Sequence, residues 1–461
     1  MSDALACFKA YDIRGKFPKP LSPELAYALG LVLAKHFAVH KAIIGHDIRL
    51  SGPALRDALA SGLTSQGAEV TFLGLSGTEE VYYAASHEDA DIGIMITGSH
   101  NPADENGFKL VRRGAIPISN DSGLLAIREE VDALLAKPMK LPQALPYREP
   151  PKKADYLNWL VQTSGIKEAQ GASRKTGFKV LACAGNGSAG PLLARLAPLL
   201  PFELIVQYGE ADGHFPHGVP NPLLPERRKD TQEAVLAAHA DLGVAFDGDF
   251  DRCFFFDAKG QFIEGYYLVG LLAKEILRTH PGQKIVHDPR LYWNTQAIVR
   301  KAGGIPVLCK TGHAFIKERM RREDAVYGGE MSAHHYFRDF NYCDSGMLPF
   351  LLVTNLLLLS PQTLEEMVAS AMADYPCSGE INRKVADPGR ILESLRALYV
   401  KEALHEDQID GLSLEFRHWR FNLRMSNTEP LLRLNVESRA DLALMQDKTQ
   451  EILAHIEQFA N

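Results

Sequence analysis

One theme occurs three times along this chain: an apolar strand, a helix, and a second apolar strand that runs into a polar loop containing glycine. The opening strands are expected at residues 41–49, 178–184 and 284–290. The closing segments are residues 90–102, 240–252 and 323–332. Apolar strands that alternate with helices form parallel sheets covered on both faces, and ligands gather at the carboxyl ends of such strands. We therefore predict three similar α/β domains whose polar loops meet at one cleft.

The C-terminal part of the chain follows another pattern. Residues 412–417 and 431–436 are predicted strands, and residues 442–459 form an amphipathic helical pattern. This favours a fourth, smaller α+β domain, with a linker at residues 137–153, which are rich in proline and lysine. The predicted domains are residues 1–150, 151–259, 260–376 and 377–461.

Composition excludes several classes of protein. The 461 residues are 46% hydrophobic and 23% charged, which is ordinary for a globular chain of several domains. The formal net charge of −7 argues against a nucleic-acid partner, so an anionic substrate would need a cationic site that is built locally.

Membrane and redox signals are weak. The most apolar run, residues 348–359, is shorter than the ~20 residues that span a bilayer, so we expect a buried helix and no membrane partner. The first dozen residues lack the apolar core of a secretory signal, which favours a cytoplasmic protein. The six cysteines lie far apart without any C-x-x-C pair, so reduced and mostly buried thiols are expected.

Three carboxylates, those of Asp247, Asp249 and Asp251, follow an apolar strand within one short loop. Oxygen ligands at this density suit Mg²⁺ or Ca²⁺. An EF-hand is excluded because Arg252 and Ala258 stand where that loop needs glycine and glutamate. The alternative is an exposed acidic turn, but three like charges so close are hard to hold together without a cation.

The segment T-G-S-H-N-P, residues 97–102, places Ser99 after a small residue at the end of another predicted strand. An exposed serine there can act as a nucleophile, and a phosphoserine carries roughly −1.5 to −2 charges that a divalent cation would balance. A plain turn is the alternative interpretation.

Two further loops carry polar groups. In G-G-E-M-S, residues 328–332, Glu330 and Ser332 could grip adjacent sugar hydroxyls, or Ser332 could simply cap a turn. The segment R-M-S-N-T-E-P, residues 424–430, could cradle a phosphate, or be a surface turn.

The glycines of G-N-G-S-A-G, residues 185–190, match a dinucleotide-binding fingerprint, and Glu210 lies about twenty residues further on. A tight strand-to-helix turn needs the same glycines in any α/β unit, and we prefer that interpretation.

Seven motifs, taken together and in order, resemble the α-D-phosphohexomutase superfamily, and more closely its bacterial phosphomannomutase and phosphoglucomutase/phosphomannomutase members. They are F-K-A-Y-D-I-R-G (8–15), T-G-S-H-N-P, N-G-F-K-L (106–110), D-G-D-F-D-R, K-T-G-H-A-F-I-K (310–317), G-G-E-M-S-A-H-H-Y-F and R-M-S-N-T-E-P. The resemblance covers essentially the whole chain. It implies three similar α/β domains with mixed or parallel sheets and a smaller C-terminal α+β domain around a central cleft.

The resemblance also implies roles for individual residues. Ser99 would be the phosphoserine and, with Asp247, Asp249 and Asp251, would hold one Mg²⁺ ion. The residues that would line the reacting centre are Tyr11, Arg14, Lys109, Arg252 and His313. Of these, Lys109 and His313 would be the candidates for proton transfer. The substrate would be held by Arg290, Glu330, Ser332, Arg424, Ser426, Asn427 and Thr428.

The activity implied is reversible phosphoryl transfer between mannose 6-phosphate and mannose 1-phosphate, through phosphorylated Ser99 and a hexose 1,6-bisphosphate, by a monomer or weak dimer. Glucose phosphates are also expected as substrates, and a primarily phosphoglucomutase activity is the alternative. Rival interpretations are a sugar-phosphate-binding protein without catalysis and a metal-dependent phosphatase. Two positions depart from the commoner family pattern, Gly98 before the serine and Arg290 in place of lysine.

Overall fold

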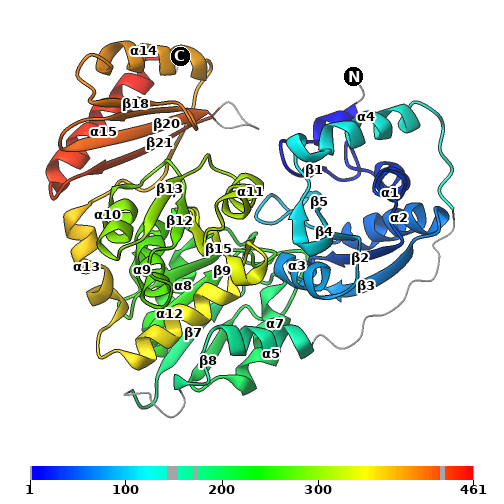
Figure 1. Cartoon of the computed structure of the whole chain (residues 1–461), viewed down its shortest axis with the longest axis horizontal. Helices are drawn as coiled ribbons and strands as arrows, with labels where there is room; N and C mark the ends of the chain where they lie inside the picture. The colour runs from blue at the N-terminus through cyan, green and yellow to red at the C-terminus, as the bar shows by residue number, and fades with distance from the viewer. Residues whose placement is uncertain (1–2, 143–153, 170–174, 426–430, 460–461) are drawn as a thin grey trace. The chain divides into compact units, whose positions relative to one another are not determined.

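The computed structural model describes residues 3–142, 154–169, 175–425 and 431–459 (Figure 1). The chain divides into two compact units. The first comprises Met1–Phe262 and Tyr336–Pro361, and the second comprises Ile263–His335 and Gln362–Asn461. The predicted linker lies outside the described residues from position 143 onward.

The first sheet, in unit 1, has the strand order β1-β5-β4-β2-β3, with β6 paired to β5. Strand β2 runs parallel to β3 and β4, whereas β5 is antiparallel to its neighbours. The strands are β1 (Ile13–Lys16), β2 (Lys41–His46), β3 (Glu69–Leu75), β4 (Ile92–Ile96), β5 (Glu105–Arg112) and β6 (Ile116–Pro117). The helices are α1 (Pro23–His36), α2 (Gly52–Ser65), α3 (Thr78–His87) and α4 (Leu124–Leu135).

Both faces of this sheet are covered, which explains its continuous apolar strands. On β2, Ile44 packs in one core with residues of α1, α2 and α4, while its neighbour Ile43 packs in a second core with Val81 and Ala84 of α3. Successive side chains of a strand point to opposite faces, so every residue of such a strand must be apolar. The central strand β4 accordingly reads I-G-I-M-I and is buried throughout.

The second sheet, also built mainly in unit 1, has the order β11-β10-β9-β7-β8. Strand β7 is parallel to β8 and β9, and β10 is antiparallel to β9. The strands are β7 (Lys179–Cys183), β8 (Glu203–Gln207), β9 (Leu242–Phe246), β10 (Cys253–Phe256) and β11 (Phe262–Ile263). The helices are α5 (Ala154–Thr163), α7 (Ala189–Leu196) and α8 (Lys229–Ala238).

The third repeat places β12 between β13 and β14, all three parallel, in unit 2. These strands are β12 (Lys284–His287), β13 (Ile305–Leu308) and β14 (Tyr327–Gly329). The helices of unit 2 that accompany them are α9 (Gly265–Thr279), α10 (Trp293–Lys301), α11 (His313–Glu323) and α13 (Leu364–Asp374). The chain returns to unit 1 along β15 (His335–Phe337), which pairs antiparallel with β16 (Cys343–Asp344) and leads to α12 (Met347–Leu359).

The C-terminal part of unit 2 is an antiparallel sheet in the order β17-β21-β20-β19-β18. Its strands are β17 (Ile381–Lys384), β18 (His405–Asp407), β19 (Leu412–Glu415), β20 (Trp419–Met425) and β21 (Leu431–Ser438). Helices α14 (Pro388–Tyr399) and α15 (Leu442–Glu457) share one apolar core with it. The fold-class prediction of three mixed α/β sheets and a smaller α+β part is therefore confirmed.

The three α/β sheets repeat one local order: β4-β2-β3, β9-β7-β8 and β14-β12-β13. In each, the strand that closes the predicted theme lies beside the opening strand. The prediction missed the third strand of each set, β3, β8 or β13. The polar loops that follow β4, β9 and β14 are those that contain Ser99, the three aspartates, and Glu330 with Ser332.

Two smaller predictions are also answered. The apolar run 348–359 lies within helix α12, whose residues are largely buried. Among the described residues, no single helix has the length and apolar composition of a membrane span; only α12 and α13 taken together meet that test. All six cysteines are free; five are buried, and Cys377 is partly buried.

Candidate active site

The loop after β4 buries Ser99 against the loop after β9. Ser99 is 2% exposed and its backbone has a φ of 48°, an uncommon left-handed conformation for a residue other than glycine. Its Oγ donates a hydrogen bond to Asp247 Oδ2 at 3.0 Å. His100 Nδ1 lies 3.1 Å from the same Oγ and accepts a hydrogen bond from Arg252. The predicted nucleophile and the first predicted metal ligand are therefore in direct contact.

The three aspartates form one buried cluster rather than an exposed acidic turn. Asp247 and Asp249 have no exposed surface and Asp251 is 1% exposed. One carboxylate oxygen of each lies within 4.8 Å of the others, a spacing that could hold a metal ion. Among the described residues, Asp249 Oδ1 is buried without a hydrogen-bond partner. The donor set suits a divalent cation.

Cationic side chains surround this cluster. Lys109, from β5, places its Nζ 2.7 Å from Asp249 Oδ2 and also contacts Asp251. Arg252 donates from Nε to Asp247 Oδ2 at 2.8 Å. Burial raises the pKa of Asp247, whereas Lys109 lowers the pKa of Asp249 against the effect of burial. Positive charge is thus built locally in a chain of net negative charge.

Arg14 contacts the serine loop from the N-terminal segment, in which Tyr11 lies three residues earlier. The Arg14 guanidinium donates to Asp12 Oδ2 at 2.6 Å and to Gly98 O at 2.8 Å, so it contacts the serine loop directly. Tyr11 is half-buried in the bend before β1.

A second polar cluster lies in unit 2 and is centred on Arg290, which follows β12 and is 2% exposed. Its guanidinium donates to Asp288 Oδ2 at 2.9 Å and to Ser332 Oγ at 3.1 Å, and lies 3.5 Å from Glu330 Oε1. Glu330 also accepts the backbone N–H of Gly312 at 3.1 Å. The loops after β12 and β14 are thereby joined, as the carboxyl ends of neighbouring parallel strands should be.

Glu380 extends this cluster and was not predicted. Its carboxylate accepts from Arg424 at 3.0 Å, from Arg290 at 3.4 Å and from Arg433 at 3.5 Å. Burial alone would raise the pKa of Glu380, but the three guanidinium groups lower it to about 2. The structure thus brings Arg290 and Arg424 together through a residue that no motif contains.

Two groups of predicted residues are not joined to a cluster by these contacts. His313 is half-buried as the first residue of α11. Ser426, Asn427 and Thr428 lie outside the described residues.

Asp47 and Arg49 are the functional candidates that sequence reasoning missed in unit 1. They end the segment H-D-I-R (46–49), and the same spacing recurs as H-D-P-R (287–290) after the equivalent strand of the third repeat. In both copies the arginine Nε donates to the aspartate, at 3.3 Å for Arg49 and 2.9 Å for Arg290. This internal repeat is the signal that would have found them.

The glycine loop 185–190 packs against the aspartate loop. A Cβ added at Gly187 would lie 2.9 Å from Gly248 O, and the Ser188 N–H donates to that oxygen at 3.0 Å. Helix α7 begins directly afterwards, at Ala189. The glycines therefore have a packing role, in agreement with the turn interpretation.

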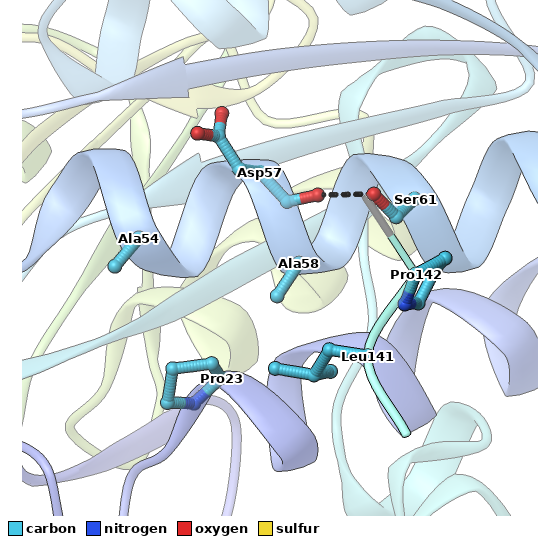
Figure 2. Close-up of a pocket in the computed structure, with 7 residues that line it drawn as sticks. All are labelled: Pro23, Ala54, Asp57, Ala58, Ser61, Leu141 and Pro142. Atoms are coloured by element: carbon cyan, nitrogen blue, oxygen red, sulfur yellow. Dashed lines mark hydrogen bonds between the residues drawn. The ribbon is translucent and has the colours of Figure 1, made fainter. Parts of the chain in front are cut away.

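A separate hollow of about 170 Å³ lies beside α2 (Figure 2). It is lined by Pro23, Ala54, Asp57, Ala58, Ser61, Leu141 and Pro142, none of which is a candidate site residue. Ser61 Oγ donates within α2 to the backbone oxygen of Asp57 at 2.8 Å, as Figure 2 shows. We assign this hollow no part in the site.

Comparison with known proteins gives matches over nearly the whole chain. Profiles of phosphoglucomutase/phosphomannomutase alpha/beta/alpha domains I, II and III match residues 6–136, 154–260 and 264–375, and the profile of the C-terminal domain matches residues 380–455. A phosphomannomutase of Salmonella typhimurium is 51% identical over 459 residues, covering 98% of this chain and 99% of the relative. A protein of Xanthomonas campestris described as phosphohexose mutases is 53% identical, covering 97% and 98%.

Among solved structures, a phosphoglucomutase/phosphomannomutase family protein of Burkholderia thailandensis superposes with a TM-score of 0.82 at 31% identity, covering 99% of each chain. The sequence matches, the domain profiles and the shared fold agree over the full length of the chain. This chain belongs to the phosphoglucomutase/phosphomannomutase family.

Proposed function

We propose that this protein is a phosphomannomutase that interconverts mannose 6-phosphate and mannose 1-phosphate and also acts on glucose phosphates. The observation that carries the proposal is the hydrogen bond from Ser99 Oγ to Asp247 inside a buried cluster of three aspartates. Relatives that match this chain over nearly its full length, at 51% and 53% identity, are described as a phosphomannomutase and as phosphohexose mutases, which supports the proposal.

Ser99, Asp247, Asp249 and Asp251 are our candidates to hold one Mg²⁺ ion. The fit rests on buried hard oxygen donors at short separation and on the unpaired Asp249 Oδ1 among the described residues. When bound, Mg²⁺ would neutralise charge on the phosphoryl oxygens.

In the proposed reaction, phosphorylated Ser99 gives its phosphoryl group to the free hydroxyl of a hexose 6-phosphate. The P–O bond to Ser99 breaks as the bond to the sugar forms, and a hexose 1,6-bisphosphate results. The bisphosphate then returns its other phosphoryl group to Ser99, so no phosphate is consumed. Added hexose 1,6-bisphosphate would therefore activate enzyme whose Ser99 is bare.

The surrounding cations would carry most of the rate enhancement, because phosphoryl transfer depends chiefly on positioning and electrostatics. Arg14, which contacts the serine loop, and Arg252, which contacts Asp247, would balance charge on the moving phosphoryl group. Lys109 and His313 are our candidates for proton transfer at the sugar hydroxyl, a role that typically contributes 10²–10⁴-fold.

We assign the binding of the sugar and its second phosphate to the remaining residues. Glu330 and Ser332 would hold sugar hydroxyls, and Arg290 joins their loop to its own. The phosphate that does not react would be bound by Arg424, Ser426, Asn427 and Thr428, with Tyr11 also contacting substrate. Arg424 offers a planar guanidinium suited to two phosphate oxygens.

Mannose and glucose differ only in configuration at C2, so a grip on O3 and O4 would accept both. The Xanthomonas relative described as phosphohexose mutases supports this second activity. A primarily phosphoglucomutase activity is the second candidate. We further propose the domain division 1–150, 151–259, 260–376 and 377–461, and a cytoplasmic monomer or weak dimer acting on hexose phosphates.

Parallel coupled assays with mannose 1-phosphate and glucose 1-phosphate test this proposal. We expect 6-phosphate to form from both sugars, faster from mannose 1-phosphate, without release of inorganic phosphate. A faster rate with glucose 1-phosphate would favour the second candidate. Release of inorganic phosphate at the rate of isomerisation would indicate a phosphatase, and no turnover of either sugar would contradict the proposal.

A further inference from the structure

The serine loop is held by a residue pair that no motif of the proposed chemistry includes. The Ser99 N–H donates to Thr97 Oγ1 at 2.7 Å, and Thr97 Oγ1 donates in turn to Asp47 Oδ2 at 2.7 Å. Asp47 Oδ2 also accepts the N–H of Gly98 at 3.2 Å. Because Ser99 has a left-handed backbone, these contacts fix a conformation that the chain would otherwise rarely adopt.

The Arg49 side chain binds the backbone oxygens of the same loop. Arg49 is 1% exposed, and its Nη2 donates to Ser99 O at 2.9 Å and to Asn101 O at 2.6 Å. Nη1 donates to Glu105 O at 2.6 Å and also to Pro102 O. Three carbonyls of the loop and that of the first residue of β5 thus bond to one planar, forked donor, which a lysine ammonium could not reproduce.

Gly98 provides the space that this guanidinium occupies. A Cβ built at Gly98 would lie 2.4 Å from both Cζ and Nε of Arg49, closer than nonbonded atoms approach. The guanidinium cannot retreat cheaply, because it is buried and its donors are already used on the loop. Gly98, one of the two positions that depart from the commoner family pattern, is thus in close contact with Arg49.

The third repeat supports a functional interpretation of this pair. Arg290, the counterpart of Arg49 in the repeated H-D-x-R segment, also reaches from the loop of its own strand to the loop of the neighbouring strand, where it donates to Ser332. In the first repeat, the corresponding arginine, Arg49, donates to the backbone oxygen of Ser99. In both repeats, the arginine of the H-D-x-R segment thus binds the polar loop that follows the neighbouring strand.

We propose that Asp47 and Arg49 are positioning residues that set Ser99 for phosphoryl transfer, and that Arg49 fills the space left by the missing side chain of Gly98. The proposal rests on the proposed function. Neither residue of the pair belongs to the proposed substrate or metal set, so their loss should lower kcat and leave KM nearly unchanged.

The test compares Arg49→Lys, Gly98→Ala and the double variant with wild type. A displacement of the nucleophile by about 1 Å can cost about 10²-fold, so each single variant should lose about that factor in kcat, with KM within about threefold. The rate at which hexose 1,6-bisphosphate phosphorylates Ser99 should fall by the same factor. In the Arg49→Lys background, Gly98→Ala should cost no more than about threefold, because a lysine side chain is not held by four carbonyls and its end can move away from the added methyl group.

Arg56→Lys is the matched control. Arg56 pairs with Asp57 at 2.6 Å on α2, away from the serine loop, and its replacement should leave kcat unchanged. Thermal unfolding of every variant shows that the measured protein is folded. Gly98→Ala, which removes no hydrogen-bonding group, decides the matter if Arg49→Lys does not fold.

Wild-type kcat in both single variants would overturn the proposal, as would the full penalty of Gly98→Ala in both backgrounds. A loss confined to KM would also overturn it. These outcomes are measured against active wild type, so they are distinct from failure of the proposed function, in which wild type itself would not turn over hexose phosphates.

Discussion

Replacing Ser99 by alanine is expected to reduce mutase activity by about four orders of magnitude or more, because the variant has no atom that can carry the phosphoryl group between substrates. The change removes one hydroxyl and its hydrogen bond to Asp247, so the fold should persist. Turnover of mannose 1-phosphate with hexose 1,6-bisphosphate in excess is the measurement. The bisphosphate should not restore activity, since it acts by phosphorylating the missing residue.

Ser86→Ala is the control for this experiment. Ser86 lies in α3, where its hydroxyl makes hydrogen bonds within the helix, to Tyr83 O at 3.0 Å and His87 Nδ1 at 2.9 Å, so activity should be unchanged. Near-normal turnover of the Ser99 variant would remove Ser99 from the mechanism.

Asp249→Asn is expected to raise the Mg²⁺ concentration for half-maximal activity by at least about tenfold, since changes around a metal site typically cost 10–100-fold in affinity. The amide has the shape of the carboxylate but lacks its charge. Asp249 Oδ1 is buried without a hydrogen-bond partner among the described residues, and Asp249 Oδ2 accepts from Thr78 at 2.5 Å. Direct binding of Mg²⁺ by calorimetry should weaken to the same degree, which separates metal affinity from catalysis.

Asp241→Asn is the matched control. Asp241 lies just before β9, at the opposite end of that strand from the aspartate cluster, and accepts the N–H of Lys179 at 2.9 Å. Its metal titration should match that of wild type. An unchanged titration in the Asp249 variant would mean that the aspartate cluster is not the metal site.

The strands that the sequence analysis missed share one physical cause. β3, β8 and β13 each lie at the edge of their sheet, where one side of the strand has no partner strand. β8 (E-L-I-V-Q) is largely half-exposed and mixes polar with apolar residues, whereas β13 (I-P-V-L) is apolar but has only four residues, one of them a proline. Central strands such as β4 are buried on both faces and give a continuous apolar signal instead.

The candidate site residues also fall into two groups, those that the sequence indicates and those that only the structure shows. Ser99, the three aspartates, Glu330 and Ser332 are candidates that the sequence indicates, because each sits directly after a strand, in a motif of unusual composition. Lys109 and Arg252 came from family motifs, and the structure places both on the aspartates.

Residues that act through tertiary contacts gave no such signal. Arg49 donates to backbone carbonyl oxygens about fifty positions further along the chain. Every residue has a backbone carbonyl, so no residue type in the sequence marks these partners. Glu380 accepts hydrogen bonds from three arginines that lie on separate strands or loops. Only the folded chain shows that these charges are neighbours.

The mass of the peptide that contains Ser99 shows whether Ser99 carries the phosphoryl group. The protein is treated with hexose 1,6-bisphosphate and Mg²⁺, freed of ligand, and digested before and after addition of mannose 6-phosphate. We expect one phosphoryl group on the peptide that contains Ser99, and its loss to the sugar when mannose 6-phosphate is added. A phosphoryl group on another residue, none at all, or one that stays on Ser99 in the presence of substrate would contradict the account.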